Sequence, residues 1–296
     1  MKTAICTKYG TPDVIQIKEV KTPTVQDDQV LIKVHATTVT SGDCVLRNSK
    51  MLVMRLLFGL TKPRKDILGS ELSGTIEVVG KNVTKFKKGD SIIAYTGMQV
   101  GAHAEYITLS ENAVLTAKPE NMTFEESAAI AFGGTTALYF LRKGNIHNGQ
   151  NVLIFGASGA VGTSAIQLAK HFGATVTAVC SSRNFELVRS LGADHVIDYT
   201  QEDFSKKGTR YDLIFDAVGK SSKSSSKQAL TLSGKYISVA GGLAKENLDD
   251  LLLLKELVEA GELKSVIDQC YPFEQISQAH AYVEKGHKQG NVVITL

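Results

Sequence analysis

The chain has 296 residues, enough for two ordinary domains that each bury a core of their own. Hydrophobic residues make up 43% and charged residues 21%, close to the averages for globular proteins, which argues against intrinsic disorder and fibrous repeats. The net charge of +3 is too small, and Lys and Arg are too scattered, to indicate a nucleic-acid partner.

Residues 1–118 alternate short β-branched runs with turn residues, which is typical of an antiparallel, β-rich domain. One apolar patch, "MLVMRLLFGL" (51–60), breaks this rhythm and is either a short helix or a hydrophobic loop. Such patches usually belong to a core, but this one also suits a lip over a substrate pocket. The predicted strands are "VIQIKEV" (14–20), "QVLIKVHATTV" (29–39), "GTIEVVG" (74–80), "DSIIAY" (90–95) and "HAEYITL" (103–109).

The hydrophobic period changes at residue 122. Thr123, with Glu126 three residues later, predicts a capping box at the start of an apolar helix over 123–143. Strand-like and helix-like segments then alternate, which predicts a doubly wound, mostly parallel sheet with helices on both faces. "SSKSSSK" (221–227) is predicted to be a short polar loop. The alternating segments are "NVLIF" (151–155), a helix from Ala160, "ATVTAVC" (174–180), "NFELVRSLGA" (184–193), "HVIDY" (195–199), "YDLIFDAVG" (211–219), "SSKQALTLSG" (225–234), "KYISVAGG" (235–242) and "LLLLKELVEAG" (251–261).

Gly156, Gly159 and Gly162 fall at the junction of the "NVLIF" strand and the helix after it. A turn of this kind brings backbone close to a pyrophosphate and points the positive end of the helix dipole at the anion. Glycine spacing alone is weak evidence, because many such turns are glycine-rich for packing reasons. Here a further strand follows at 174–179, so the turn lies in a complete βαβ unit, which indicates a dinucleotide-binding site.

The end of that second strand distinguishes between dinucleotides. A site for NAD places Asp or Glu there to accept from the ribose 2′-OH, whereas this chain has Cys180 and Ser181, with Arg183 just beyond. A carboxylate would repel a 2′-phosphate, while serine hydroxyls and a guanidinium would bind it. The sequence therefore predicts NADPH in preference to NADH. The alternative is that Arg183 is a surface residue at a helix start.

Several motifs in a fixed order carry a resemblance that extends over nearly the whole chain. They are "TTVTSGDCVLR" (37–47), "LGSELSGTIEVVGKNVTKFKKGDSI" (68–92), "AEYITLSENAVLTAKPENMTFEESAAIAFGGTTAL" (104–138), "LVRSLGADHVIDY" (187–199), "YDLIFDAVG" (211–219) and "GHKQGNVVITL" (286–296). The glycine turn itself, 156–162, has one position more than the commoner Gly-x-Gly-x-x-Gly. In these motifs the chain resembles the zinc-independent branch of the medium-chain dehydrogenase/reductase superfamily, the quinone oxidoreductases or zeta-crystallin-like proteins.

The resemblance implies an α/β fold with two domains and an active site in the cleft between them. A GroES-like, β-rich domain would comprise residues 1–121, to which 266–296 return, and a Rossmann NADP-binding domain would comprise 122–265. The connection between "SVAGG" and "LLLLKELVEAG" is shorter than the family's, which lies near the substrate pocket and helps to make the dimer edge. A homodimer and the shape of the substrate therefore stay open.

Metal ligands are not indicated. Zinc-dependent relatives carry Gly-His-Glu where this chain has Gly69-Ser70-Glu71, and a serine cannot replace an imidazole ligand. The seven histidines stand alone, and the closely spaced cysteines of a structural zinc lobe are missing. The prediction is that the protein holds no metal.

The cysteines also bear on location. Cys6, Cys44, Cys180 and Cys270 lie far apart without a Cys-x-x-Cys pair, which favours reduced thiols in a cytoplasmic protein. The start, "MKTAICTKYG", lacks an apolar signal region, so no targeting peptide is expected. No run approaches the roughly 18 apolar residues of a membrane span, so no membrane association is expected either.

The candidate catalytic residues are Thr40 and Tyr95. The resemblance places residues 40–43 in the loop that lines the family's cleft, but many relatives have Asn in place of Thr40 and an aromatic hydroxyl in place of Val45. Thr40 could donate to the nicotinamide amide or to a substrate oxygen, and Tyr95 ends the "DSIIAY" strand. Each could instead pack or cap locally, and Asp43 is predicted to fix its own turn.

The cofactor contacts are predicted from the strand ends of the parallel sheet and from the resemblance. They are Gly156, Ser158, Gly159, Ala160, Val161 and Gly162 for the pyrophosphate, Ser181, Arg183 and Tyr199 for the adenosine phosphates, Val218 and Gly241 for the ribose and nicotinamide, and Thr135 and Asn291 as further contacts.

Without zinc, the family's chemistry changes. Alcohol oxidation needs a group that stabilises an alkoxide, whereas hydride added to a quinone or enone leaves a delocalised enolate that hydroxyl or backbone donors can hold. The resemblance thus implies a zinc-independent, NADPH-dependent oxidoreductase for small quinones or α,β-unsaturated carbonyls. The alternatives are a zinc-free alcohol or aldehyde reductase, an enoyl-thioester reductase, and a non-catalytic, crystallin-like NADPH-binding protein.

Overall fold

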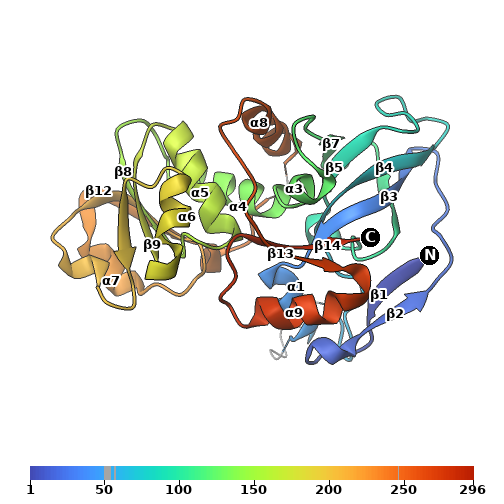
Figure 1. Cartoon of the computed structure of the whole chain (residues 1–296), viewed down its shortest axis with the longest axis horizontal. Coiled ribbons are helices and arrows are strands. Elements are labelled where there is room, and N and C mark those ends of the chain that lie inside the picture. Colours follow the sequence, from blue (N-terminus) through green and yellow to red (C-terminus); the bar gives the residue numbers. More distant parts are fainter. Residues whose placement is uncertain (50–54, 57, 246) are drawn as a thin grey trace.

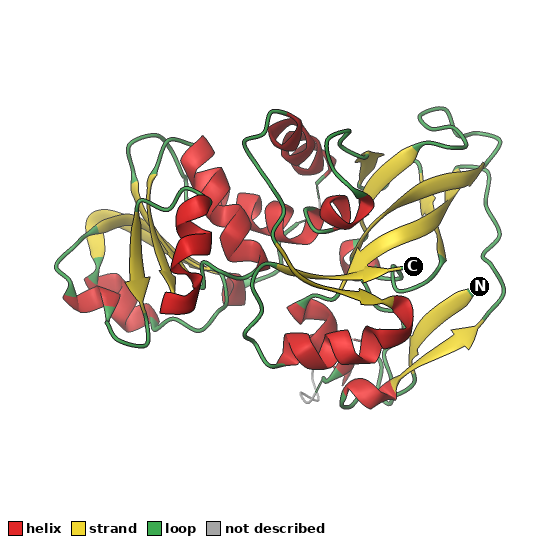
Figure 2. Cartoon of the chain, in the orientation of Figure 1, coloured by secondary structure: helices red, strands yellow, loops and turns green. Residues whose placement is uncertain are grey.

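Two large sheets organise the computed structural model, which describes residues 1–49, 55–56, 58–245 and 247–296. Figure 1 shows the two sheets at opposite ends of the long axis, with helices α4 (Ala131–Lys143) and α5 (Ala160–His171) between them. Helices lie beside both sheets (Figure 2). The chain therefore has the mixed α/β architecture that the sequence predicts.

The N-terminal sheet is mostly antiparallel, with the order β13-β14-β3-β4-β5-β7 and with β6 also paired to β3. Branched residues that alternate along β3, among them Val30, Ile32 and Val34, are buried in its core, the pattern of a half-buried strand. A separate antiparallel pair joins β1 (Lys2–Cys6) to β2 (Ile15–Glu19). The strands of the sheet are β3 (Gln29–Thr38), β4 (Glu71–Val79), β5 (Ser91–Tyr95), β6 (Tyr106–Ser110), β7 (Leu115–Ala117), β13 (Ile267–Pro272) and β14 (Asn291–Thr295).

The closing segment of the chain lies with the N-terminal sheet. Strand β14 pairs antiparallel with β3, where Val293 stands opposite Thr38, and β13 pairs parallel with β14. Helix α9 (Ile276–Glu284) packs against α1 (Ser41–Arg47). These pairings place residues 266–296 with the N-terminal sheet, as expected if this segment returns to the first domain. The boundaries of the two domains stay predictions.

The second sheet is parallel, with the order β10-β9-β8-β11-β12. This is the strand order of a Rossmann fold, and it reverses direction on either side of β8, where such sheets bind ligands at the carboxyl ends of their strands. Its strands are β8 (Asn151–Phe155), β9 (Thr175–Cys180), β10 (His195–Asp198), β11 (Tyr211–Asp216) and β12 (Leu230–Ser238). Its other helices are α6 (Phe185–Ser190), α7 (Lys223–Gln228) and α8 (Leu248–Glu259).

Between the sheets, the capping box is confirmed. The Thr123 hydroxyl accepts from the backbone N–H of Glu126, whose carboxylate accepts from that of Thr123, at the start of α3 (Phe124–Ala128). The single helix predicted over 123–143 is wrong, because α3 ends at Ala128 and α4 begins at Ala131. The break frees the N–H of Phe132, in the first turn of α4, to donate to Glu71 Oε2 at 2.6 Å. One buried carboxylate thus ties α4 to the first sheet.

Other elements also differ from the predictions. Strands β1 and β7 were not predicted, and the turn residues after β3 open helix α1. "SSKSSSK" is not a loop, because the Ser222 hydroxyl accepts from Ser225 N–H and so caps helix α7. Much of the apolar patch 51–60 lies outside the described residues. Short 3-10 helices are η1 (Pro12–Val14), η2 (Gly97–Gln99), η3 (Ser182–Asn184), η4 (Phe204–Lys206), η5 (Val239–Gly241) and η6 (Phe273–Gln275).

The main core lies where α4, α5 and α8 pack on β8, β9 and β11, through fully buried residues such as Leu138, Ile154, Ile166, Phe215 and Leu254. This packing fixes the start of α5 above the end of β8. In the described part of the chain, none of the helices has the length and apolar character to span a membrane.

Candidate active site

Two neighbouring cavities lie between the sheets. The polar cavity, of about 510 Å³, includes Ser158, Ser181, Arg183, Asn184, Lys220 and Lys288 in its wall. The apolar cavity, of about 320 Å³, includes Val45, Leu46, Phe58, Met98, Phe140 and Leu243. The residues that line both are Thr40, Ser41, Phe132, Val161, Ala217 and Val239. A molecule that fills the polar cavity can therefore meet a second molecule in the apolar cavity at this junction.

The glycine turn forms one wall of the polar cavity, and each of its glycines has a different task. Gly156 has a φ of +76°, the left-handed region that a turn here requires. A Cβ on Gly162 would lie 2.2 Å from Gly156 O, so Gly162 permits close packing of helix on turn. At Gly159 a Cβ would have only ordinary contact, 3.7 Å from Gly156 O. Packing within the fold therefore does not require a glycine at position 159, and the missing side chain leaves room for a ligand instead.

The start of α5 suits a phosphate group. Gly159 is the N-cap of this 12-residue helix, and in the described part of the chain no side-chain hydrogen bond caps the helix. Ser158 is held beside it by Asn184, whose Nδ2 donates to Ser158 Oγ at 2.9 Å. Unpaired N–H groups and the helix dipole together bind anions. The turn therefore fits the pyrophosphate of a dinucleotide, as the sequence predicts.

The wall of the polar cavity includes three positively charged residues. Arg183 lines it, and its Nη2 donates to His287 O at 2.6 Å. Lys220 and Lys288 line it too, and among the described residues of its wall there is no Asp or Glu. Burial lowers the pKa of Lys288 to about 8, against the opposing effect of the nearby Glu71. Positive charge in this wall attracts an anionic group, such as a phosphate, more strongly than a neutral ribose hydroxyl.

Most of the predicted cofactor residues line the polar cavity. They are Gly156, Ser158, Gly159, Ala160, Val161, Ser181, Arg183, Tyr199, Val218 and Asn291, together with Thr40. Asn291 is also a structural tie, because its Nδ2 donates to Ala129 O at 3.0 Å and to Val266 O at 3.1 Å. Sequence reasoning missed Asn184, at the end of the short helix η3, and Lys220 and Lys288, which lie in two separate loops.

Three predicted residues lie elsewhere. Gly162 is behind the turn, as described above, and Gly241 is not among the described residues that line either cavity, whereas Gly242 lines the apolar one. Thr135 is 1% exposed, and its hydroxyl donates to Ala131 O at 2.6 Å within α4. One residue further around the helix, Thr136 lines the apolar cavity instead. Successive residues of an α-helix are rotated by about 100° around its axis, so the two threonine side chains point in different directions.

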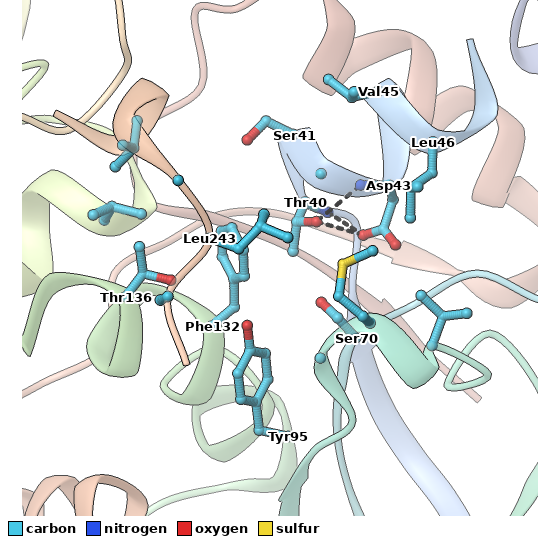
Figure 3. A pocket seen from close by; sticks show the side chains of 18 of the residues that line it. Thr40, Ser41, Asp43, Val45, Leu46, Ser70, Tyr95, Phe132, Thr136 and Leu243 are labelled. Atoms are coloured by element: carbon cyan, nitrogen blue, oxygen red, sulfur yellow. Dashed lines mark hydrogen bonds between the residues drawn. The ribbon is translucent and has the colours of Figure 1, made fainter. Parts of the chain in front are cut away.

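Thr40 is engaged within its own loop. Its hydroxyl donates to Asp43 Oδ2 at 2.6 Å and accepts from Asp43 N–H at 3.1 Å, closing a capping box at α1 (Figure 3). Asp43 Oδ1 also accepts from the N–H of Gly69 at 2.9 Å. Asp43 therefore fixes its turn, as predicted. The Thr40 proton is used locally, which disfavours Thr40 as the donor to a ligand oxygen.

The apolar cavity holds two other hydroxyl groups of interest. Tyr95, the second catalytic candidate, lines it at the end of β5. Ser70, which the sequence shows only as a lost zinc ligand, lines it as well. Figure 3 shows both residues around one space with Phe132 and Leu243. No sequence signal marks Ser70 as functional, because its importance depends on what surrounds its hydroxyl.

Glu71, next to Ser70, is fully buried and faces away from solvent. Its carboxylate accepts from Thr38 Oγ1 at 2.5 Å and from Phe132 N–H at 2.6 Å. Burial raises the pKa of Glu71 to about 7, although these hydrogen bonds act in the other direction. Glu71 thus fixes the positions of β4 and α4 around the junction.

Comparison with known families matches both parts of the chain. The family described as alcohol dehydrogenase GroES-like domain matches residues 26–120, and the family described as zinc-binding dehydrogenase matches residues 160–266. A second family of the latter description matches residues 243–294. The order of these matches is that of the two sheets.

Individual proteins are similar over nearly the full length. The NADPH-dependent alkenal/one oxidoreductase of Arabidopsis thaliana is 32% identical, over 99% of this chain and 79% of that protein. The quinone-oxidoreductase homolog of Spinacia oleracea is 31% identical, over 96% of this chain and 95% of that protein. The alignment with the Arabidopsis protein spans 314 positions, more than the 296 residues here, so that relative carries residues that this chain lacks.

A solved structure agrees with the sequence comparisons. The quinone oxidoreductase from Coxiella burnetii superposes with a TM-score of 0.90 at 28% identity, covering 100% of this chain and 99% of that one. The fold, the glycine turn and the full-length similarity lead to one assignment. The chain belongs to the medium-chain dehydrogenase/reductase superfamily, in its quinone oxidoreductase branch.

Proposed function

We propose that this protein is an NADPH-dependent reductase that reduces α,β-unsaturated carbonyls or quinones without a metal ion. The observation that carries the proposal is the junction of the two cavities. A dinucleotide site ends, at residues such as Phe132 and Val161, against an apolar space large enough for a small acceptor. The names of the similar Arabidopsis and Spinacia proteins, an alkenal/one oxidoreductase and a quinone-oxidoreductase homolog, support the same class of acceptor.

NADPH is proposed in preference to NADH because of the positive charge in the wall of the polar cavity. Arg183 and Lys220 lie in its wall without a carboxylate among the described lining residues. A 2′-phosphate would gain charge-assisted hydrogen bonds there. The 2′-hydroxyl of NADH would find no Asp or Glu among the described lining residues to accept its hydrogen bond. The network of Asn184 with Ser158 and Ser181 adds further donors and acceptors.

Metal-free chemistry is proposed from the residues at the position of a zinc site. Ser70 replaces an imidazole ligand, and Cys44 is turned toward His280, with its Sγ 3.7 Å from the ring Nδ1. Burial raises the pKa of the Cys44 thiol to about 12, which disfavours the thiolate that zinc requires. The described residues contain no group of three or more His, Cys, Asp or Glu placed to hold a metal ion.

The reaction adds one hydride and one proton across a conjugated system. When bound, NADPH would supply hydride by breaking its nicotinamide C4–H bond. The β-carbon of the acceptor would gain the new C–H bond, electron density would move to the carbonyl oxygen, and a proton from water would add at the α-carbon to give the saturated product. The chain's own residues position the acceptor and keep bulk water away. Phe132, Val161 and Val239 provide apolar walls on both sides of the junction.

The position of the new C–H bond tests this proposal. The protein is incubated with 4-deuterated NADPH, of each stereochemistry in turn, and a simple aryl enone, and the product is analysed by NMR. We expect a saturated ketone from both labelled cofactors, with deuterium at the β-carbon from one of the two stereoisomers only. An allylic alcohol would instead indicate a carbonyl reductase, and the absence of product would reject the proposed acceptor class.

A further inference from the structure

We propose that the Ser70 hydroxyl is a catalytic hydrogen-bond donor, which binds the carbonyl oxygen of the acceptor and stabilises its negative charge during reduction. This inference rests on the proposed function and adds to it the group that recognises the acceptor. It places a serine hydroxyl at the position where zinc-dependent relatives carry a metal ligand.

The first observation is an unpartnered hydroxyl group that faces a cavity. Ser70 is only 8% exposed, and its Oγ has no hydrogen-bond partner among the described residues. The residue lines the apolar cavity, and Figure 3 shows its side chain beside the space bounded by Tyr95, Phe132 and Leu243. A buried hydroxyl normally finds a partner within the fold, so a group left open toward a cavity is available to a ligand.

The second observation is that the backbone holds Ser70 rigidly. Its carbonyl oxygen accepts from the N–H groups of Thr96, at 2.7 Å, and Gly97, at 3.2 Å. On one side, Gly69 N–H donates to Asp43 at 2.9 Å, and on the other, Glu71 pairs with Tyr95 across β4 and β5. Only the side-chain torsion is left to move. A donor fixed in this way needs little reorganisation when charge develops on a bound oxygen.

The surrounding chemistry makes a single neutral donor effective. The wall of the cavity is mostly apolar, with side chains such as Phe58, Met98 and Phe132, and also includes Asp43 and Tyr95. In a site of low polarity, a hydrogen bond to an oxygen that gains negative charge is stronger than in water. Thr40, the neighbouring hydroxyl, already donates to Asp43 and so leaves this task to another group.

The charge that Ser70 would stabilise arises on the substrate. As the β-carbon of an enone gains a C–H bond, electron density moves through the conjugated system to the carbonyl oxygen, which becomes an enolate oxygen. The Ser70 proton stays on Ser70 and donates a hydrogen bond. The proton of the product comes from water, so the serine is unchanged at the end of the cycle.

Three substitutions at Ser70 test the assignment through steady-state kinetics. Ser70→Ala removes the donor, Ser70→Cys keeps similar volume with a weak donor, and Ser70→Thr keeps a hydroxyl. We expect kcat/KM for an enone to fall about tenfold or more in the first two variants and to recover in the third. Across para-substituted aryl enones, the rate of Ser70→Ala should also depend more steeply on the electrophilicity of the acceptor.

Ser127 provides a matched control. It is another fully buried serine whose Oγ has no partner among the described residues, but it lies in α3 and outside the described walls of both cavities. Ser127→Ala should leave kcat/KM unchanged. Neither alanine variant should melt at a lower temperature than the parent, because each removes a buried hydroxyl that makes no hydrogen bond. NADPH titrations should match for all of these proteins.

A spectroscopic readout separates this inference from the proposed function. The infrared C=O band of a ¹³C-labelled enone, bound in the presence of NADP⁺, should lie at lower frequency in the parent and Ser70→Thr proteins than in Ser70→Ala. Equal frequencies in parent and Ser70→Ala, kcat/KM values within twofold of each other, or no band from bound enone in the parent would overturn the role of Ser70. Lack of turnover by the parent rejects the proposed function instead, and the band comparison then still decides the role of Ser70.

Discussion

One wall of the polar cavity is a continuous unit, the end of β8, the glycine turn and the start of α5, whereas much of the apolar cavity is formed by large side chains of separate segments. At that wall, the start of α5 and small residues such as Gly159 and Ser158 line the cavity. In the second, Val45, Met98 and Leu243 project from three different parts of the chain. The first cavity depends on the fold itself, and the second can change shape without altering the fold. Cofactor binding and acceptor choice should therefore respond to different mutations.

The largest effect should come from closing the polar cavity at Gly159. Gly159 has a φ of −82° and open space where a Cβ would stand, so Gly159→Val should fold normally. Its side chain would stand between the start of α5 and a pyrophosphate, and we expect the Kd for NADPH to rise about a hundredfold, or about 2.7 kcal/mol. Fluorescence titration with NADPH measures this. An unchanged Kd would mean that the turn serves packing alone.

Gly162→Ala is the contrasting variant at the same turn. Its Cβ would lie 2.2 Å from Gly156 O, and the helix must shift to admit it. Overpacking of this kind costs about 1–3 kcal/mol of the free energy of unfolding. Urea denaturation should show the loss in Gly162→Ala and not in Gly159→Val. The opposite result would reverse the tasks assigned to the two glycines.

Arg183→Ala should separate the two dinucleotides. Loss of a charge-assisted bond to the 2′-phosphate should weaken NADPH binding about tenfold to thirtyfold and leave NADH binding nearly unchanged. Arg189→Ala, on the next helix, α6, but outside the described cavity walls, is the control. Equal losses for NADPH and NADH on titration would contradict the charge argument.

A smaller effect is expected at the mouth of the apolar cavity. Leu243 is 72% exposed and lines this cavity, so Leu243→Asp should fold while placing a charge beside an apolar acceptor. The KM for apolar enones should rise up to about tenfold with kcat and NADPH binding unchanged. Leu232→Asp, on exposed β12 and outside both described walls, serves as reference. Equal KM values in the two variants would mean that acceptors do not contact Leu243.

The smallest effect concerns Glu71, which joins the two parts of the site. Burial raises its folded-state pKa from the ordinary 4.5 to about 7. The folded protein therefore holds this proton more tightly than the unfolded chain, and stability from Glu71 falls as pH rises from 4.5 to 7 and stays low above 7. The Tm difference between the parent and Glu71→Gln is measured at two pH values. The Tm of the parent minus that of Glu71→Gln should be about 2–4 °C larger at pH 5 than at pH 8. A difference independent of pH would show that Glu71 does not titrate in this range.

The same contrast explains what the sequence could predict. The glycine turn, Ser181 and Arg183 were found because a βαβ unit places them by local rules that hold from one protein to another. The contact of Thr135 with the cofactor stays a prediction, and its hydroxyl donates to Ala131 O within α4. The break before α4 depends on Glu71, 61 residues away in sequence, and periodicity contains no sign of it.

Ser70 illustrates the remaining limit. Its residue type is ordinary, and its proposed role follows from the lack of a partner for its hydroxyl among the described residues, which only the packed structure reveals. Lys220 and Lys288 became part of one wall through the crossing of distant loops. Residues that act through backbone geometry were thus predictable, and residues that act through tertiary neighbours were not.

The central claim is tested most directly by oxidation of NADPH, followed by its absorbance, with purified and chelator-treated protein. A para-quinone and a simple enone are offered separately, with and without added zinc. The account predicts turnover of at least one acceptor at a rate that neither chelation nor zinc changes. NADPH binding without turnover of either acceptor, or activity that is lost on chelation and restored by zinc, would contradict it.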